Sequence, residues 1–318
     1  MAFDITSSPI GLVINFDSMS EAFGFPTGFR DPSYFIGYDR LMEAVNKFDL
    51  KLTIFVIGRD LENREVFDRV RDWTAEGHEI GNHSWSHKTN MGALPERELH
   101  DEIHRAHDLI SNCCGVEPIG FSSPGWSTSR KLVAHLIDLN YVYDTSVFPT
   151  FALYPIVLKV ALNHFGDWKR MWQILDRRDW LMPATVDREP FVVDRNFKKV
   201  TEQEKDSLVI FPLPSLGRFN ITIWHTVGFV LGWPRFFPRL EKALERLEGF
   251  YYLMHPADFV SREDADPDRL YTHSLERLDI SIDRKIEMME RVFEVMKNSN
   301  RPPKQMGEMA SCYLKKAR

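Results

Sequence analysis

Short apolar runs alternate with amphipathic stretches along the first half of the chain, and this alternation limits the fold more than any other feature. Strands are expected at 12–16, 52–57 and 78–82, and the run LTIFVI at 52–57 has the β-branched character of a strand covered on both faces. Helices are expected between them, at 37–48 and 64–75. A rhythm of strand, helix and strand predicts parallel βα units.

The rhythm continues with a helix at 95–113, a strand at 119–122 and a helix at 129–140. It fails between about 151 and 205, where we place a mostly helical or irregular insertion. It then resumes with strands at 208–211 and 251–255, helices at 237–247 and 280–297, and a final strand near 308–313. A length of 318 residues fits one α/β barrel over 1–318 that carries this insertion.

Charge and cysteine content argue against several classes of protein. The formal net charge is −6 and no basic run stands out, which disfavours nucleic-acid binding. The first residues lack the pattern of a secretory signal, and the three cysteines form neither a disulfide framework nor a zinc knuckle. No stretch reaches the roughly 18 continuous apolar residues of a membrane span. We therefore expect a cytoplasmic protein.

Two segments are unusually apolar. Residues 151–162 (FALYPIVLKVAL) and 221–237 (ITIWHTVGFVLGWPRFF) are rich in aliphatic and aromatic side chains. One interpretation is an inserted helical subdomain that packs on the barrel. The other is a surface that contacts the membrane peripherally, at its inner face, and meets a lipid-linked substrate there. The segment 168–172, with two Trp, a Lys and an Arg, suits this second interpretation.

Two imidazoles stand four residues apart in His83-Ser84-Trp85-Ser86-His87, just after the third expected strand. This gap brings both rings to one side of a helical turn or curled loop, and imidazole is the commonest neutral ligand of zinc-class ions. Asp17, at the end of the first expected strand, offers a carboxylate to the same site. Because chemistry in α/β proteins collects at the carboxyl ends of strands, we expect Asp17, His83 and His87 to hold a divalent metal, with Zn²⁺ as the expected ion. The alternative is a pair of surface or packing histidines.

The order of these pieces resembles the polysaccharide deacetylase family (NodB-homology, carbohydrate esterase 4-like). The resemblance runs from Leu12 to about Ala310 and is weakest over the insertion. Its motifs are Asn15-Phe16-Asp17-Ser18, His83-Ser84-Trp85-Ser86-His87, Ser122-Ser123-Pro124-Gly125-Trp126, Tyr143-Asp144-Thr145-Ser146-Val147-Phe148-Pro149 and Leu253-Met254-His255. It implies a distorted (β/α) barrel and metal-dependent removal of an N-acetyl or N-formyl group from an amino sugar of a glycan or lipid-linked glycan precursor. The nearer branch is that of the lipid-linked amino-sugar deformylases.

The resemblance also implies roles for single residues. His255 would be the general acid that protonates the departing amine, and Asp144 or Asp258 would hold its imidazole in the useful tautomer. The turn Ser123-Pro124-Gly125-Trp126 would bind substrate together with Asp144. In that turn, a backbone N–H at Gly125 or Trp126 would face the oxyanion, and the Trp126 ring would face the sugar. Leu253 would line the acyl pocket.

Two departures from the family pattern bear on activity. The first motif of the family commonly has two carboxylates, a general base and a metal ligand, whereas this chain has only Asp17. Aligned as adjacent Asp-Asp, Asp17 is the base and Ser18 replaces the ligand. Aligned as Asp-x-Asp, the deformylase pattern, Asp17 is the ligand and Asn15 stands at the position of the base. We favour the second alignment, because two histidines alone would bind metal poorly. Glu21, one turn on, is a further carboxylate, and Ser122 stands where the family usually has Arg.

Two other functions compete with carbohydrate N-deacylation. The missing carboxylate and Arg favour a catalytically silent barrel that retains metal or sugar binding and serves as a binding or assembly protein. Allantoinase-like relatives use the same scaffold, so hydrolysis of an amide in a substrate that is not a sugar is the third interpretation.

Overall fold

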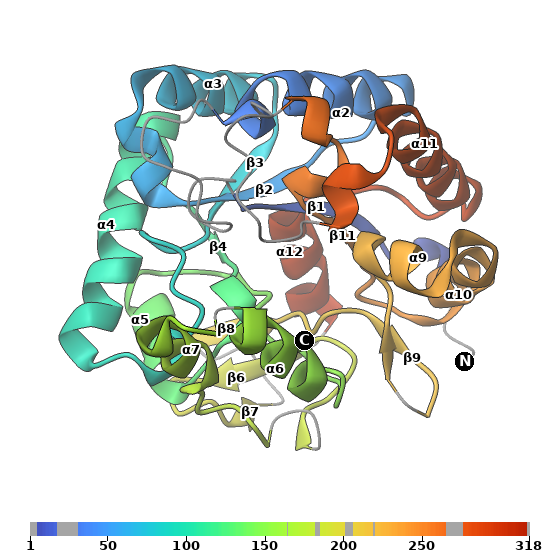
Figure 1. The fold of residues 1–318 in the computed structure, drawn as a ribbon. Helices are drawn as coiled ribbons and strands as arrows, with labels where there is room; N and C mark the ends of the chain where they lie inside the picture. Colours follow the sequence, from blue (N-terminus) through green and yellow to red (C-terminus); the bar gives the residue numbers. More distant parts are fainter. Residues whose placement is uncertain are drawn as a thin grey trace.

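A curled sheet forms the centre of the molecule, with the strand order β11-β1-β2-β3-β4-β5-β8-β6-β7 (Figure 1). From β11 to β8 the neighbouring strands are parallel, whereas β6 and β7 continue the sheet in antiparallel pairing. The strands are β1 (Gly11–Phe16), β2 (Thr53–Val56), β3 (Glu79–Asn82), β4 (Gly120–Phe121), β5 (Tyr143–Asp144), β6 (Phe191–Asp194), β7 (Lys199–Val200), β8 (Ser207–Ile210) and β11 (Tyr251–Met254). This computed structural model describes residues 5–17, 31–163, 165–181, 185–200, 206–218, 220–264 and 276–316.

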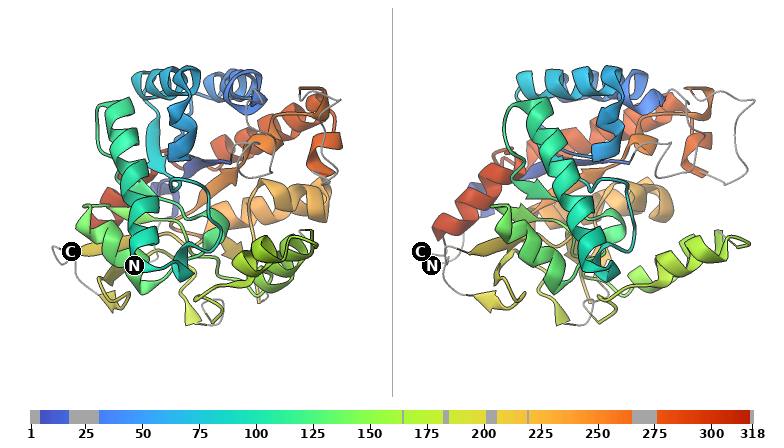
Figure 2. Two further views of the ribbon diagram at one scale, coloured as in Figure 1. Left: turned by 60° about the vertical axis from the view of Figure 1, so that its left-hand side comes forward. Right: turned by 90° about the vertical axis from the view of Figure 1, so that its left-hand side faces the viewer.

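Helices cover the outer face of the sheet, as Figures 1 and 2 show. They are α2 (Ile36–Lys47), α3 (Arg64–Ala75), α4 (Glu96–Cys114), α5 (Arg130–Asp138), α9 (His225–Leu231), α10 (Trp233–Arg246) and α11 (Ile282–Asn298). The helix expected at 237–247 begins earlier, at Trp233, because Pro234 occupies the first turn, where its missing N–H costs nothing. A small hairpin, β9 (Ser215–Leu216) with β10 (Ile221–Thr222), precedes α9. The whole is the distorted (β/α) barrel that the sequence predicts.

Alternate side chains of each central strand point to opposite faces, and this positions the site. On β1, Leu12 and Ile14 pack in the cluster under the outer helices, whereas Val13 belongs to the inner cluster with Phe55 and Leu253. Because a strand has a period of two, Asn15 continues the inner row toward the carboxyl end of β1. Asp17 follows directly after the strand.

The last described element is the helix α12 (Met306–Lys316), so the strand expected near 308–313 is wrong. Met306, Met309 and Ala310 recur at helical spacing, and all three are buried in the inner cluster. A Cβ on Gly11 would lie 3.0 Å from the sulfur atoms of Met306 and Met309. The close fit explains both the glycine at the start of β1 and the helix that packs against it.

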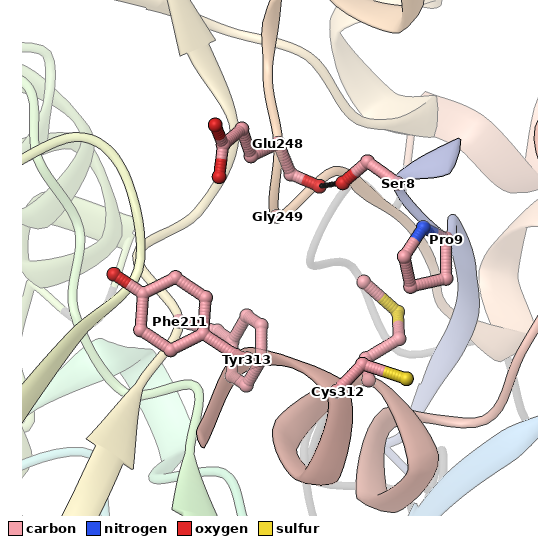
Figure 3. A pocket seen from close by; sticks show the side chains of 8 residues that line it. Ser8, Pro9, Phe211, Glu248, Gly249, Cys312 and Tyr313 are labelled. Atoms are coloured by element: carbon pink, nitrogen blue, oxygen red, sulfur yellow. Dashed lines mark hydrogen bonds between the residues drawn. The ribbon is translucent and has the colours of Figure 1, made fainter. Parts of the chain in front are cut away.

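A small cavity lies beside α12, near the amino-terminal end of β1 and away from the residues that the sequence singles out (Figure 3). Phe211, Cys312 and Tyr313 line one side of it. On the other side, the Ser8 hydroxyl donates a hydrogen bond of 2.7 Å to the carbonyl of Glu248. The cavity carries none of the candidate ligands.

Two helices and two strands occupy the region where an insertion is expected. α6 (Leu153–Asn163) and α7 (Trp168–Leu175) pack on each other, and β6 and β7 follow. Phe191, Val192 and Val193 are consecutive and buried, which suits a strand inside a sheet rather than an irregular loop. Among the described residues of this region, helices come first and the strands β6 and β7 follow. Among the residues that the structure describes, no helix combines the length and apolarity that crossing a bilayer needs.

Candidate active site

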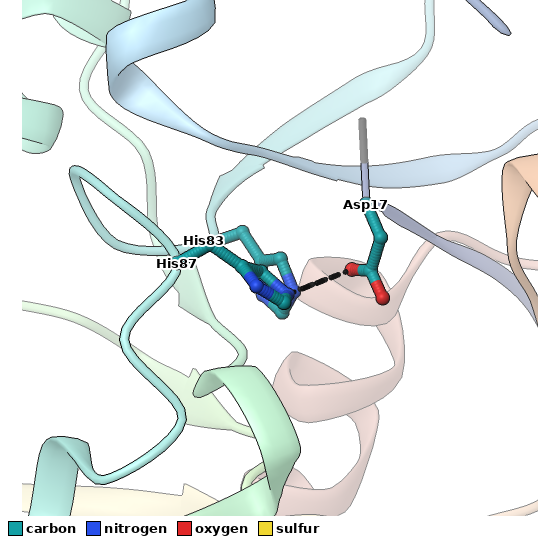
Figure 4. Close-up of side chains that lie close together, drawn as sticks. All are labelled: Asp17, His83 and His87. Atoms are coloured by element: carbon teal, nitrogen blue, oxygen red, sulfur yellow. Dashed lines mark hydrogen bonds and ion pairs between the residues drawn. The ribbon is translucent and has the colours of Figure 1, made fainter. Parts of the chain in front are cut away.

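Three side chains converge at the carboxyl ends of β1 and β3, as Figure 4 shows. The Nε2 atoms of His83 and His87 lie 2.9 Å and 3.3 Å from Oδ1 of Asp17. One ligand atom from each residue falls within 4.8 Å of the other two. The structure thus brings together the three residues that the sequence predicts as metal ligands.

His83 is held in one orientation by a backbone carbonyl. Its ring is buried, and Nδ1 lies 2.6 Å from the carbonyl oxygen of Ser122. A carbonyl only accepts, so Nδ1 carries the proton and Nε2 of the neutral ring presents a lone pair. That lone pair faces the Asp17 carboxylate, and two acceptors at hydrogen-bond distance repel unless a proton or a cation lies between them.

The loop that carries the two histidines is curled rather than helical. Ser84 and His87 both have a positive φ, of 65° and 55°, which non-glycine residues adopt at a cost. Local bonds offset that cost: the Ser84 N–H donates to Asn82 Oδ1, and the His87 N–H donates to the Ser84 hydroxyl. The buried Glu102 of α4 accepts from the N–H and hydroxyl of Ser86. The sequence pattern did not single out Glu102, whose role depends on where α4 packs.

The Asp17 carboxylate is set to be ionised. Burial raises its pKa, but the nearby imidazoles of His87, His83 and His255 lower it more, so the pKa lies well below its usual range. A buried carboxylate that remains charged needs a positive partner. A divalent cation supplies that charge, and one carboxylate with two imidazoles is a ligand set that leaves positions open for water and substrate. The described residues therefore fit a catalytic metal.

His255 follows β11 and points at the same carboxylate. Its Nε2 lies 3.8 Å from Asp17 Oδ2, and its side chain is nearly buried. A capping box holds the start of the turn η6 (Pro256–Asp258), in which the His255 N–H donates to Asp258 Oδ2 at 2.8 Å. This bond holds the backbone of His255 and not its ring, so orientation of the imidazole by Asp258 stays a prediction.

Asp144 was expected to accept a hydrogen bond from the His255 imidazole, but its partner in the structure is Ser146. Its Oδ1 accepts from the N–H and the hydroxyl of Ser146, and that hydroxyl accepts from the Ser123 N–H at 2.7 Å. Burial raises the pKa of Asp144 to about 7, although the bonds from Ser146 lower it. Asp144 thus supports the turn beginning at Ser123 from beneath, and its contact with substrate stays a prediction.

The turn η5 (Pro124–Trp126) carries the rest of the predicted substrate site. The Ser123 hydroxyl donates to the carbonyl of Ser127, and the Trp126 N–H donates to the carbonyl of Ser123. Both groups are used inside the turn, so of the two N–H groups expected to face an oxyanion the one at Trp126 is already bonded, and the one at Gly125 stays a prediction. Gly125 has φ 61°, and a Cβ there would approach Thr89, which accounts for the glycine.

Three aromatic rings, those of Trp126, Phe148 and Trp224, pack beside His255, and we call them the aromatic wall. The Trp126 ring lies 4.9 Å from Phe148 and 5.4 Å from Trp224 between centroids, and Trp224 lies 5.2 Å from the His255 ring. Trp224 precedes α9 and was not among the expected site residues, although the aromatic richness of 221–237 was its signal. Leu253 is buried in the inner cluster, two residues before His255 on the same face of β11.

A buried ion pair from the insertion holds the same turn. The Arg177 guanidinium donates to the carbonyls of Gly125 (2.7 Å) and Trp126 (2.8 Å), and forms a two-point salt bridge with Asp179. Both charged side chains are almost fully buried. No sequence spacing links 177 to 125, so nothing in the pattern predicted this contact.

Several polar side chains on or just after the strands around the site are buried and have one atom without a hydrogen-bond partner among the described residues. Asn15, at Oδ1, and Ser122, at Oγ, are two of them. Both are positions where this sequence departs from the family pattern. Ser18 and Glu21, which the two alignments of the first motif invoke, lie outside the described residues.

Comparison with known proteins supports the predicted family. Residues 14–143 match the polysaccharide deacetylase family model. A peptidoglycan deacetylase from Helicobacter pylori is 27% identical over 148 residues, which are 46% of this chain and 48% of that protein. A chitin deacetylase from Pestalotiopsis is 24% identical over 139 residues, 43% of this chain and 45% of that protein. The matched part thus spans about half the length of these relatives.

The fold likeness extends over the whole chain. The crystal structure of a candidate polysaccharide deacetylase from Mycobacterium smegmatis superposes with a TM-score of 0.59 at 15% identity, covering 98% of this chain and 92% of that one. Fold and site define a distorted (β/α) barrel with a candidate metal centre. The family match and these relatives make residues 14–143 similar to polysaccharide deacetylases.

Proposed function

We propose that this protein hydrolyses the N-acyl group of an amino sugar and that the reaction depends on a divalent metal. The convergence of Asp17, His83 and His87 on one point carries the proposal. When bound by these residues, a Zn²⁺-class ion supplies a water of lowered pKa and polarises the amide carbonyl. The Ser122 carbonyl keeps the coordinating nitrogen of His83 unprotonated and aimed at that point.

The remaining residues act on the substrate. His255, with Nε2 toward Asp17, donates a proton to the nitrogen of the departing amine, so that a neutral amine leaves. Trp126 and Trp224 offer apolar ring faces to a sugar and shield the site from bulk water. Leu253, two residues before His255 on the same face of β11, would line the pocket for a small acyl group.

The N-formyl or N-acetyl group of a lipid-linked precursor is the finer part of the proposal. Its support is the pattern of the first motif, in which Asn15 and Asp17 align with the Asp-x-Asp arrangement of the deformylases. A cytoplasmic protein at the inner face of the membrane would meet a precursor rather than a finished polymer.

A silent barrel is the second candidate, and one observation favours it. Asn15 stands at the position of the base on the favoured alignment and cannot accept a proton there, while its Oδ1 is buried without a partner among the described residues. Such a protein would still bind metal and sugar.

Release of acetate or formate separates the two candidates. The purified chain, loaded with Zn²⁺ or Co²⁺, would be incubated with N-acetylated and N-formylated amino-sugar oligomers, and metal content would be measured alongside. Acid release that His83→Ala abolishes supports the hydrolase. Stoichiometric metal with no acid release from any of these substrates would establish the silent barrel instead. Ureides as competitors test the allantoinase-like interpretation, since an amidase for substrates other than sugars would be inhibited by them.

A further inference from the structure

One part of the surface is far more apolar than the rest of the described residues. Eight of the twelve large apolar side chains that are exposed in the described part of the chain lie between 151 and 181. Together they form what we call the α6–α7 face: Phe151, Ile156, Leu158, Leu162, Phe165, Trp168, Trp172 and Leu181. The exposed fractions of Phe165 and Trp172 are 72% and 64%, which is far above what a packed side chain shows.

The helix α6 is apolar on two sides. Leu153, Val157 and Ala161 lie one turn apart and are buried in the inner cluster. Leu158 and Leu162 lie on another side of the helix and are exposed. A helix that is apolar nearly all round is normally covered nearly all round, so its outer side implies a partner.

The chemistry of the α6–α7 face suits a lipid surface. Trp168 and Trp172 lie one turn apart on α7, and the Trp168 ring lies 5.4 Å from that of Phe165. Indole rings favour the headgroup zone, and the basic residues Lys169 and Arg170 stand between the two tryptophans. Residues 151–181 contain five basic and three acidic residues, a net charge of +2 in a chain of net charge −6. The apolar face is therefore also the locally cationic one.

The helix α6 and the segment that follows β11 project to the same side of the molecule. In the right-hand view of Figure 2, α6 (yellow-green) projects toward the same side as the orange segment that follows the carboxyl end of β11. His255 lies at that end of β11. The chain leaving α7 also contributes Arg177, which holds the carbonyls of Gly125 and Trp126. The segment that follows α7 thus contacts the turn that carries Trp126.

We propose that the α6–α7 face docks on an anionic bilayer surface and presents the site to an amino sugar carried on a lipid. The part concerning substrate rests on the proposed function, whereas docking itself is independent of it. Trp, Phe and Leu side chains enter the interface, and the basic residues contact anionic headgroups. Docking then places the carboxyl ends of the strands toward the headgroup layer.

Vesicle co-sedimentation of the full-length chain tests the docking. The vesicles would be phosphatidylcholine with and without phosphatidylglycerol. The test variant is the double substitution Trp168→Ser and Trp172→Ser, and the matched control is Val116→Ser, which removes an equally exposed apolar side chain after α4. We expect binding to the anionic vesicles that weakens with salt, falls about ten-fold or more in the double variant and is unchanged in the control.

The outcomes separate docking from catalysis. Absence of vesicle binding by a protein that hydrolyses soluble oligomers would overturn the docking and leave the proposed function. Vesicle binding without hydrolysis of any substrate would support the docking and contradict the proposed function. A concentration-dependent dimer that the double variant abolishes, with no binding to vesicles, would show that the face joins two copies of the chain, and would also overturn the proposal. Because the substituted side chains are exposed, circular dichroism and Tm should match those of the unsubstituted protein.

Discussion

The Nε2 atom of His83 lies 2.9 Å from Oδ1 of Asp17, although 66 residues separate them in the chain. Two parallel strands bring them together: β1 and β3 flank β2, and each side chain stands at a carboxyl end. With Nδ1 of His83 donating to the Ser122 carbonyl, the facing atoms are a lone pair and a carboxylate oxygen. This relationship is what makes a cation, rather than a hydrogen bond alone, the natural occupant.

Removal of one imidazole should empty the metal site. We expect His87→Ala to lower bound metal to well below one ion per chain and to lower kcat/KM by at least about 100-fold, because two ligands hold a divalent ion poorly. Metal analysis of the dialysed protein and acid release measure the two effects. His100→Ala, which removes an exposed histidine of α4, is the control. Full metal content in His87→Ala would contradict the assignment.

Substitution of Asn15 by Asp tests the alignment of the first motif. If Asn15 stands at the position of the base, a carboxylate there should raise kcat by about 100-fold, within the range usual for general-base catalysis. Burying the new charge near the site will cost some stability, which a Tm measurement follows. Asn15→Ala has no base to offer and is the control. An Asn15→Asp protein that folds, binds metal and gains no rate would favour Asp17 itself as the base.

His255 should affect the chemical step more than binding. We expect His255→Gln to lower kcat about 10²- to 10⁴-fold with little change in KM, since the lost proton transfer occurs in the transition state. Metal content should stay unchanged, because His255 is not among the three ligand residues. Substrates with better leaving groups should lose less rate. An equal loss for good and poor leaving groups would argue for a merely structural histidine.

The buried pair Arg177–Asp179 should stabilise the turn that carries Trp126. Arg177→Met leaves Asp179 buried without its partner, and breaking such a pair typically costs about 3–5 kcal/mol. Thermal unfolding measures the loss. Arg178→Met removes the neighbouring exposed Arg and should change Tm little. KM for amino-sugar oligomers should rise in Arg177→Met at temperatures where it remains folded, and an unchanged KM would separate the pair from substrate binding.

Asp144 should make stability depend on pH. Burial raises its pKa to about 7 from an ordinary value of 3.8, so the folded protein binds a proton more tightly than the unfolded chain. Its contribution is therefore full below about pH 4 and is lost as pH rises to about 7, a change on the order of 4 kcal/mol. Asp144→Asn should flatten the dependence of Tm on pH between about 4 and 7. The same slope in both proteins would refute the raised pKa.

The local pattern of apolar residues was sufficient to predict most helices and strands of the barrel. The helix α3 spans the residues expected from apolar spacing, and β3 delivers His83 where the strand was expected to end. These predictions succeed because strand and helix periodicities depend on neighbours within a few residues. The final segment failed because the alternation expected near 308–313 is also compatible with a helix, and only packing of Met306 and Met309 against Gly11 selects the helix.

The sequence by itself therefore determined the parallel strands, the ligand pair in one loop and the carboxylate at the end of β1. Tertiary structure alone decided which distant groups complete the site: the Ser122 carbonyl on His83, Trp224 beside His255, and Arg177 on the turn at Gly125. The reason is physical. Residues that meet within one helix or strand are separated by a fixed number of positions in the sequence. Residues that meet between elements have no fixed separation, because their contact depends on how the sheet curls.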